Sequence, residues 1–404
     1  MTPQLQRRRL ALFAYFFIPG VALASWVTRT PAIRDGIQVS LAGMGLVLLG
    51  LSIGSMCGIL LSGGAVSRYG TRSVLVAGMW ILICGLAVMA LGVTMSAALA
   101  VGLGLGLFGF GMGVAEIAIN IDGAAVEQIS GRPLMHTLHG CFSLGTVCGA
   151  VAGFGVASAG VPVQWHLSLI AAAAIVPIVW CARFIPADTG RATGRAVGVT
   201  RRGKMRWPDK KLGLIGLIVL AFALAEGAAN DWLPILMVDE HGFSQATGSL
   251  VYVAFAAAMT VGRLAGGRLL HRLGPVAVIR LSGLFCALGL MVVVFAPVPQ
   301  MAALSVVLWG LGAALGFPIA ISAAGASGPD ATQRVKAVTI CGYTAFLVGP
   351  PLLGLIGEHS GLRAAMVLVL ALIMIAAAVA GAVRGQPARV GQGGKPMETR
   401  GETR

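Results

Sequence analysis

The sequence is short of charge and of paired cysteines. Asp, Glu, Lys and Arg make up 11% of its 404 residues, whereas a soluble domain carries about a quarter. The seven Cys are odd in number and form no C-x-x-C pair, which argues against a disulfide framework or a zinc site and predicts small buried side chains. We expect no metal and no cofactor. Disorder is excluded as well, because disordered chains have low hydrophobicity.

Apolar residues are in excess, at 57%. They group into twelve segments, each near the roughly 20 residues that a membrane-spanning helix needs. Because spanning segments must satisfy their own backbone hydrogen bonds, they predict an all-α polytopic membrane protein with 12 transmembrane helices. The approximate ranges are 10–30, 41–66, 73–93, 97–120, 135–159, 164–184, 212–234, 245–270, 275–296, 300–325, 336–357 and 362–383.

Two glycine-containing stretches resemble nucleotide-binding loops without their context. Gly104-x-Gly106-x-x-Gly109 lies within an apolar run that follows no strand, and its spacing instead suits close helix packing. The stretch Gly198 to Lys204 is followed by Met205, where a phosphate-binding loop needs Ser or Thr for magnesium. We therefore predict no nucleotide site.

A polar stretch divides the segments into two groups of six. We expect an N-terminal six-helix half (1–184), a basic linker (185–211), a C-terminal six-helix half (212–383) and a polar tail (384–404). With linker and both termini in the cytoplasm, the opposite loops hold only Arg29, Arg34 and Arg363 of 29 basic residues. The positive-inside rule favours this orientation in the cell (inner) membrane. The charge of +15 then marks orientation, and we expect no nucleic-acid partner.

The two halves share motifs at nearly one offset. Ser40 and Ser244 lie 204 residues apart, as do Gly106 and Gly310, and each Ser is a plausible helix N-cap. Pro31 matches Pro234 at an offset of 203. Parallel six-helix repeats are a transporter architecture with the substrate site between the halves. The first segment also resembles a signal peptide, because an apolar run follows Arg7–Arg9 and leads to Ala22-Leu23-Ala24 as a cleavage site, but its removal would break the repeat.

The same offset relates two polar loops, and these loops resemble a family motif. The first contains Gly63, Arg68, Gly70 and Arg72, and the second contains Gly267, Arg272 and Gly274. The pattern is similar to the G-x-x-x-D-R-x-G-R-R loop of the major facilitator superfamily, except that Ser67 and His271 replace the Asp. The resemblance covers essentially the whole chain. It implies a cytoplasmic charge network that governs inward opening, here with only its basic side, Arg68, Arg72 and Arg272.

A narrower resemblance lies in the segment 97–120. Glu116-Ile-Ala-Ile-Asn120 is similar to the E-x-A-x-N stretch of fucose-permease-like sugar:proton symporters, which implies that Glu116 is a sugar and proton site. The helix 1 Asp of that family has no match in Ala24 to Arg29. Ser25 to Asp35, His139 to Gly145 and Glu226 to Trp232 also resemble an uncharacterised bacterial branch related to fucose permease. Drug:proton antiporters of the superfamily carry an Arg in helix 4 and a Gly-Pro in helix 5, and both are missing here.

Few ionisable residues lie inside the apolar segments, where they are costly and usually face a cavity or a partner. Glu116 and Asn120 are four apart and share a helix face, and so do Glu226 and Asn230. Each pair offers a titratable acceptor and an amide that both donates and accepts. His139 adds a group that titrates near neutrality. The alternative is that these side chains only bridge neighbouring helices.

Two further charges lie near the outer helix ends. Arg29 ends the first segment and Asp231 approaches the end of the seventh, so we predict that they pair as an outer gate. The alternative is a pair of solvated interfacial charges.

These residues lead to a functional hypothesis. We expect a secondary active transporter, not an enzyme, that moves a small polar solute by alternating access with proton symport, and a sugar is one candidate solute. Its partners would be solute, protons and the lipid bilayer, and we expect a monomer. The alternatives are an exporter or antiporter of drugs or metabolites and, more distantly, a membrane sensor without transport.

Overall fold

The computed structural model describes residues 2–131, 134–192, 209–328 and 330–384. All of its regular elements are helical within these residues. The N-terminal half contains α1 (Pro3–Val27), α2 (Thr30–Ile37), α3 (Leu41–Thr94), α4 (Ala98–Ser130), α5 (Met135–Ser158) and α6 (Val163–Ala182). The C-terminal half contains α7 (Lys210–Asp239), α8 (Gln245–Phe295), α9 (Pro299–Gly325), α10 (Ala331–Ser360), α11 (Leu362–Ala378) and the short 3-10 helix η1 (Val379–Val383).

Ten helices of the described chain are long and apolar enough to cross a membrane, and two of them are hairpins. α3 has 54 residues and α8 has 51, whereas about 20 suffice for one pass. Each contains one glycine with positive φ, Gly70 (φ 81°) or Gly274 (φ 75°), where the chain reverses. Counting both arms of each hairpin is consistent with the twelve expected spans.

The ends of both hairpins show the reversal. The position of a Cβ at Gly36, just before α3, is 2.9 Å from Val93 at the other end of α3. His241, just before α8, contacts the carbonyl oxygen of Val293 through Nε2 at 3.1 Å. Both termini of each hairpin therefore lie at the same end of the molecule.

The hairpins also begin alike. Ser40 Oγ accepts from the N–H of Gly43 at 3.2 Å, and Ser244 Oγ accepts from the N–H of Thr247 at 3.1 Å. These are N-caps, which satisfy free N–H groups in the first helical turn. The caps and reversals thus recur at the offset seen in the sequence.

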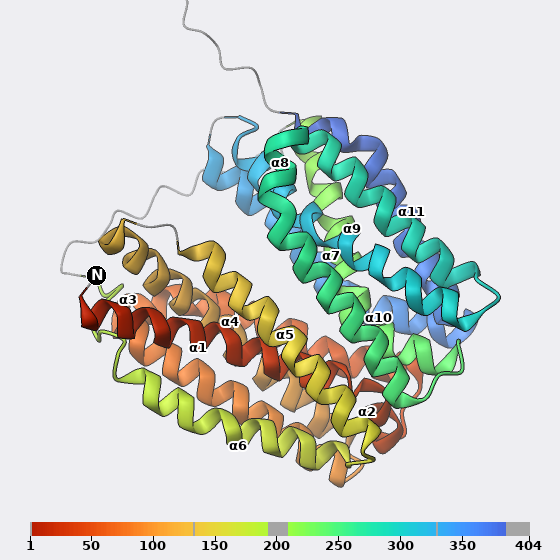
Figure 1. The fold of residues 1–404 in the computed structure, drawn as a ribbon, viewed down its shortest axis with the longest axis horizontal. Coiled ribbons are helices and arrows are strands. Elements are labelled where there is room, and N and C mark those ends of the chain that lie inside the picture. Colours follow the sequence, from red (N-terminus) through yellow and green to blue (C-terminus); the bar gives the residue numbers. More distant parts are fainter. Residues whose placement is uncertain (1, 132–133, 193–208, 329, 385–404) are drawn as a thin grey trace, which may run out of the picture.

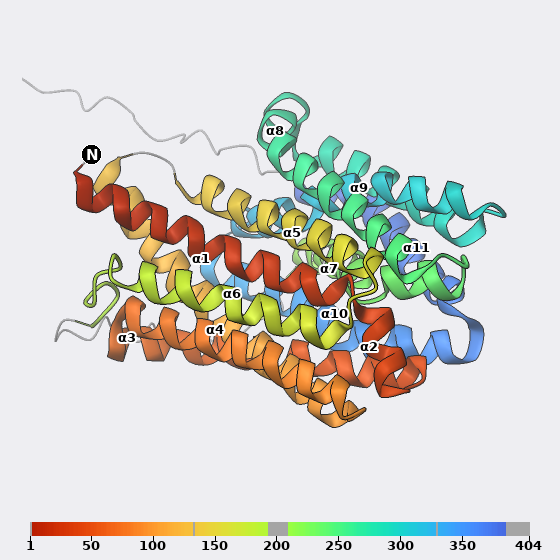
Figure 2. The ribbon, with the colours of Figure 1, turned by 60° about the horizontal axis from the view of Figure 1, so that its bottom comes forward.

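The two halves meet along two helix pairs. α3 packs against α10 and α5 packs against α8, and Figure 2 shows α5 beside α8 with α6 on the opposite side of α1. A Cβ at Gly45 of α3 would lie 2.8 Å from the carbonyl oxygen of Pro350 in α10. Glycine is therefore required there for the backbones to approach so closely.

We name the two ends of the molecule by their contents. The linker end holds Arg8, Thr189 and Asp209, and the far end holds Arg34 and Asp239. In Figure 1 the ribbons of the two halves diverge toward the linker end and approach each other at the far end, near α2, α7 and α10.

Polar contacts between the halves gather at the far end. Arg34 pairs with Asp239, with Nη2 to Oδ1 at 2.9 Å. Gln245 Nε2 donates to Asp35 Oδ2 at 3.0 Å. The other bonds join Ser249 Oγ to the carbonyl oxygen of Thr28 (2.7 Å), Ala42 N to Glu358 Oε2 (3.2 Å) and Ser52 Oγ to the carbonyl oxygen of Phe346 (2.6 Å). The protein is thus closed at the far end.

Many large apolar side chains point outward, among them Leu60 (73% exposed), Leu99 (76%) and Leu304 (75%). Such a surface suits lipid and would be unfavourable in water. All seven cysteines are free, and Cys57, Cys84 and Cys148 are exposed. The prediction that the cysteines are buried is wrong for these three, and Cys141 and Cys341 are only partly buried.

Residues 193–208 of the predicted linker and 385–404 of the predicted tail lie outside the described residues. The proposed division at 184, 211 and 383 therefore stays a prediction.

Candidate functional site

An ion pair lies at the centre of the C-terminal half, facing the other half. Glu226 of α7 accepts through Oε1 from Arg263 Nη2 of α8 at 2.9 Å, with the Glu226 side chain 20% exposed and that of Arg263 37% exposed. A charge inside a membrane protein normally has a partner or a cavity, and Glu226 has both.

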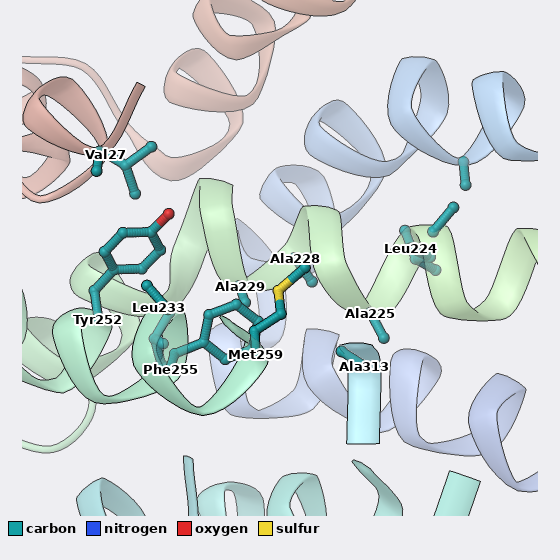
Figure 3. Close-up of a cluster of buried hydrophobic side chains, with 14 of the residues drawn as sticks. Val27, Leu224, Ala225, Ala228, Ala229, Leu233, Tyr252, Phe255, Met259 and Ala313 are labelled. Carbon is teal, nitrogen blue, oxygen red and sulfur yellow. The ribbon is translucent and has the colours of Figure 1, made fainter. Parts of the chain in front are cut away.

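One turn along α7, an amide joins the same site. Asn230 Oδ1 accepts from the hydroxyl of Tyr252 at 2.9 Å. Tyr252 stacks on Phe255 with ring centroids 6.2 Å apart, and Phe255 meets Trp309 edge-on at 5.7 Å. Figure 3 shows Tyr252, Phe255 and Met259 of α8 gathered against Ala228 and Ala229 of α7. This packed layer holds the polar groups in a fixed orientation.

A small cavity of about 40 Å³ adjoins these groups and is bounded by both halves. Its polar lining includes Ser143 and Thr146 of α5 besides Glu226, Asn230 and Arg263, and Leu23 of α1 also lines it. Ligand pockets usually start near 300 Å³. The cavity therefore has room for water only, and a solute requires the halves to move apart.

The second predicted carboxylate lies elsewhere. Glu116 of α4 is exposed and forms no ion pair or hydrogen bond with the described residues. It acts electrostatically on Tyr343 of α10, so it faces the opposite half. Asn120 is half-buried, and its Oδ1 has no hydrogen-bond partner among the described residues. Glu116 and Asn120 do not line the cavity beside Glu226.

His139 lies on α5 one turn before Ser143. Its side chain is exposed, and its ring meets Phe16 of α1 edge-on with centroids 5.1 Å apart. It therefore contacts a helix of its own half, next to the cavity lining and outside it.

The predicted gate between Arg29 and Asp231 is wrong for this conformation. Arg29 is 5% exposed and donates through Nη2 to the carbonyl oxygen of Val161 at 2.7 Å. Asp231 is 7% exposed, and among the described residues no ion pair joins it to Arg29. Arg34 and Asp239, each a few residues farther along the chain, make the connection between the halves instead.

The motif loop is held by a carboxylate from α4. Asp122 is fully buried and accepts from Arg8 through both oxygens, at 2.7 and 2.9 Å, and from the hydroxyl of Thr71 at 3.0 Å. Thr71 follows Gly70, where a Cβ would lie 2.1 Å from the carbonyl oxygen of Ala187. An acid is therefore present at this loop, although Ser67 replaces the Asp of the motif.

The expected basic side of that network is not engaged. Arg68, Arg72 and Arg272 are exposed, and they form no ion pair with any residue that the structure describes. Arg68 lies over the ring of Tyr69, 5.2 Å from its centroid. Gly63 and Gly267 are exposed on the first arms of their hairpins, where a Cβ would meet no described atom within 4 Å.

Comparison with known families decides the assignment. Residues 11–338 and 215–402 match the Major Facilitator Superfamily. The chain belongs to this superfamily of transporters.

Its relatives agree with that membership. An uncharacterised MFS-type transporter of Yersinia pestis is 31% identical over 373 residues, which cover 91% of this chain and 94% of the relative. A mutant of the nucleoside transporter NupG has the same fold, with a TM-score of 0.74, 15% identity and coverage of 93% of this chain and 98% of that one. A variant of the Escherichia coli fucose:proton symporter FucP has a TM-score of 0.63, 14% identity and coverage of 94% and 98%.

In this MFS protein the sequence reasoning missed Arg263, Tyr252 and Asp122. Arg263 and Tyr252 both lie inside the apolar segment 245–270. The position of Arg263, seven residues before the end of a predicted span, could have marked it as a site residue, because a charge inside a span needs a partner. Asp122 lies two residues beyond the segment 97–120, and its burial could not be read from that position.

Proposed function

We propose that this MFS transporter binds a small polar solute between its halves at Glu226, Arg263 and Asn230, and moves it by proton-coupled symport. The observation that carries the proposal is the ion pair and the amide–hydroxyl pair at a cavity that both halves bound. A polyol or sugar is the solute class that these groups suit best.

The chemistry follows from what each group donates and accepts. A carboxylate accepts, a guanidinium donates, and an amide and a hydroxyl do both. Arg263 and Glu226 are bound to each other here, so a solute with hydroxyl groups can replace their mutual bond with bonds to itself. Such an exchange leaves no buried charge without a partner, which would be costly.

The two carboxylates have different roles in this proposal. Arg263 compensates the charge of Glu226, so Glu226 binds the solute together with its counter-ion. Glu116 has no counter-ion among the described residues, and an uncompensated charge is unfavourable when a site closes around it. Glu116 therefore takes up the proton, and the closed state contains it in neutral form.

The conformation supports alternating access. The halves are closed at the far end by Arg34 and Asp239, so the movement that admits a solute to the cavity takes place at the linker end. Opening the far end requires that pair to break. We place the protein in the inner membrane as a monomer, with the linker end in the cytoplasm. The basic residues that gather at the linker end support this orientation.

Counterflow in proteoliposomes tests the site. Vesicles preloaded with each member of a panel of sugars, polyols, nucleosides and carboxylates receive the same solute with a radiolabel outside. We expect exchange of a hydroxyl-rich neutral solute by the native protein and its loss in Glu226→Gln. The matched control is Asp188→Asn, an exposed carboxylate that pairs with Arg191 within the N-terminal part of the chain and should retain exchange. Exchange that Glu226→Gln leaves unchanged would remove the proposed site.

A further inference from the structure

A second hollow lies at the far end of the molecule. Its volume is about 470 Å³, within the range of pockets that hold small molecules. The turn between α1 and α2, the end of α3 and the loop between α5 and α6 form most of its wall. One residue of the other half, Gln245, also lines it. The hollow is separate from the central cavity.

The wall contains a buried cation without a counter-ion. Arg29 is 5% exposed, and its Nη1 has no hydrogen-bond partner among the described residues. Its Nη2 is bound to the neutral carbonyl oxygen of Val161. Burial lowers the pKa of the Arg29 guanidinium, but an arginine stays charged at neutral pH. The unbalanced charge therefore favours an anion.

The surroundings offer no competing acid inside the hollow. Asp35 is occupied by Arg34 and Gln245, and Asp239 is occupied by Arg34. His166, 1% exposed, lies within electrostatic range of Arg29, and neither of its ring nitrogens has a hydrogen-bond partner among the described residues. The region behind Arg29 thus supplies no carboxylate.

We propose that this hollow binds a small organic carboxylate on Arg29 and that the bound ligand holds the far end closed. The planar guanidinium matches a carboxylate. Nη1 is the donor without a partner among the described residues, and because it is covered in this structure, the Arg29 side chain turns toward the hollow when the carboxylate binds. Val93, Val161 and Pro162 in the wall suit a short apolar chain, and the amide of Gln164 supplies a further polar contact.

The position of Gln245 gives the ligand its effect. Gln245 belongs to the C-terminal half and lines the hollow only while the far end is closed. A ligand that contacts both halves stabilises the state to which it binds. The carboxylate is therefore a ligand of the closed state that slows opening, and this inference is independent of the proton-coupled transport proposed above.

Thermal unfolding of the purified protein in detergent tests the site. Sodium butyrate is compared with sodium chloride at equal ionic strength. For the native protein we expect butyrate to raise Tm by about 2 °C or more relative to chloride, the size of a modest binding energy. The shift should vanish in Arg29→Gln and persist in Arg363→Gln, which removes the same charge from the same end outside the hollow.

A second variant keeps the test decisive if Arg29→Gln does not fold. Ala157→Phe fills the hollow and leaves Arg29 in place, so it should also abolish the butyrate shift. Glu226→Gln should keep the shift, because the central site does not contribute. Equal Tm values of the native protein in butyrate and in chloride would overturn the proposal, because the hollow would then have no preference for an organic carboxylate. A butyrate shift that survives both Arg29→Gln and Ala157→Phe would overturn the site itself.

Discussion

In each half an Arg–Asp ion pair at the linker end joins the start of the first helix to a later helix. The two halves differ in which helix supplies the Arg and which supplies the Asp. In the N-terminal half the first helix supplies Arg8 and α4 supplies Asp122, with side chains 9% and 0% exposed. In the C-terminal half the residue before α7 supplies Asp209 and α10 supplies Arg334, with 48% and 8% exposed. The two halves thus share the pattern of a charge pair at the linker end but not its polarity or its burial.

The difference in burial matters more than the difference in polarity. A buried ion pair becomes strongly destabilising when one partner is removed, because the other charge is left in a medium of low dielectric constant. A partly exposed carboxylate is solvated by water and contributes little. The N-terminal half is therefore the half whose linker end depends on its ion pair.

The carboxylates that face the opposite half show the reverse relationship. The C-terminal half holds the paired Glu226, which lines the cavity, and the N-terminal half holds Glu116, which lies outside the cavity and has no ion-pair partner among the described residues. The half with the buried ion pair at its linker end thus carries the carboxylate to which we assign proton uptake in the proposed mechanism.

The largest effect is expected at Asp122. Asp122→Asn removes the charge that compensates Arg8, and we expect it to lower the free energy of unfolding by about 3–5 kcal/mol. Asp209→Asn, the matched change in the other half, should lower it by less than about 1 kcal/mol, because Asn caps a helix as well as Asp does. Chemical unfolding in detergent measures both, and equal losses would break the comparison between the halves.

The next effect concerns the pair in the cavity. Arg263→Gln leaves Glu226 without its counter-ion, and we expect exchange to fall by about 10–100-fold, the worth of a hydrogen bond to a charged group. The double variant Glu226→Arg/Arg263→Glu swaps the two charges, so it restores an ion pair that serves structure but not the solute site. Solute counterflow separates the two, since recovery in the double variant would show that the pair serves structure only.

A smaller effect is expected at the far end. Arg34→Gln breaks the pair with Asp239, and a partly exposed ion pair contributes about 0.2–1 kcal/mol. The equilibrium should shift toward far-end opening by roughly 1.4–5-fold. Labelling of Ser52→Cys by a membrane-impermeant maleimide added from the far side measures that shift, in a variant whose seven native cysteines are replaced by Ser or Ala. An unchanged labelling rate in the Arg34→Gln background would mean that the pair does not hold this end closed.

The smallest effect is the pH response of Asp209. The N–H of Leu212 and then Arg334 lower the pKa of Asp209 below its ordinary value of 3.8. A carboxyl with a lowered pKa stabilises the folded protein above the unfolded value and loses that contribution as pH falls through the folded value. The protection factor of the Leu212 amide, the exchange rate of an unfolded chain at the same pH divided by that of the folded protein, should therefore fall only below about pH 4. Asp209→Asn should remove this dependence. A protection factor that already falls between pH 7 and pH 5 would contradict the prediction.

Much of the fold could be predicted from the sequence because its signals are local. The apolar runs indicated the spans, and Ser40 and Ser244 indicated the caps that open both hairpins. Glu226 and Asn230 were placed on one face by their spacing of four residues, and both line the cavity.

The pairings between distant residues could not be predicted in the same way. Arg263 lies 37 residues from Glu226, and Asp122 lies 114 residues from Arg8. The gate prediction failed because a position near a helix end gives depth but not direction. Asp231 is one residue beyond Asn230, about 100° around the helix, and does not line the cavity that Asn230 lines.

The most direct test of the account concerns Glu116 and the proton. In proteoliposomes with an imposed pH gradient, a solute found by counterflow should accumulate against its own gradient with the native protein. With Glu116→Gln we expect solute exchange to continue while gradient-driven accumulation is lost, because a neutral amide cannot carry the proton. Accumulation that Glu116→Gln leaves intact, or that the native protein shows without a pH gradient, would contradict proton coupling through Glu116.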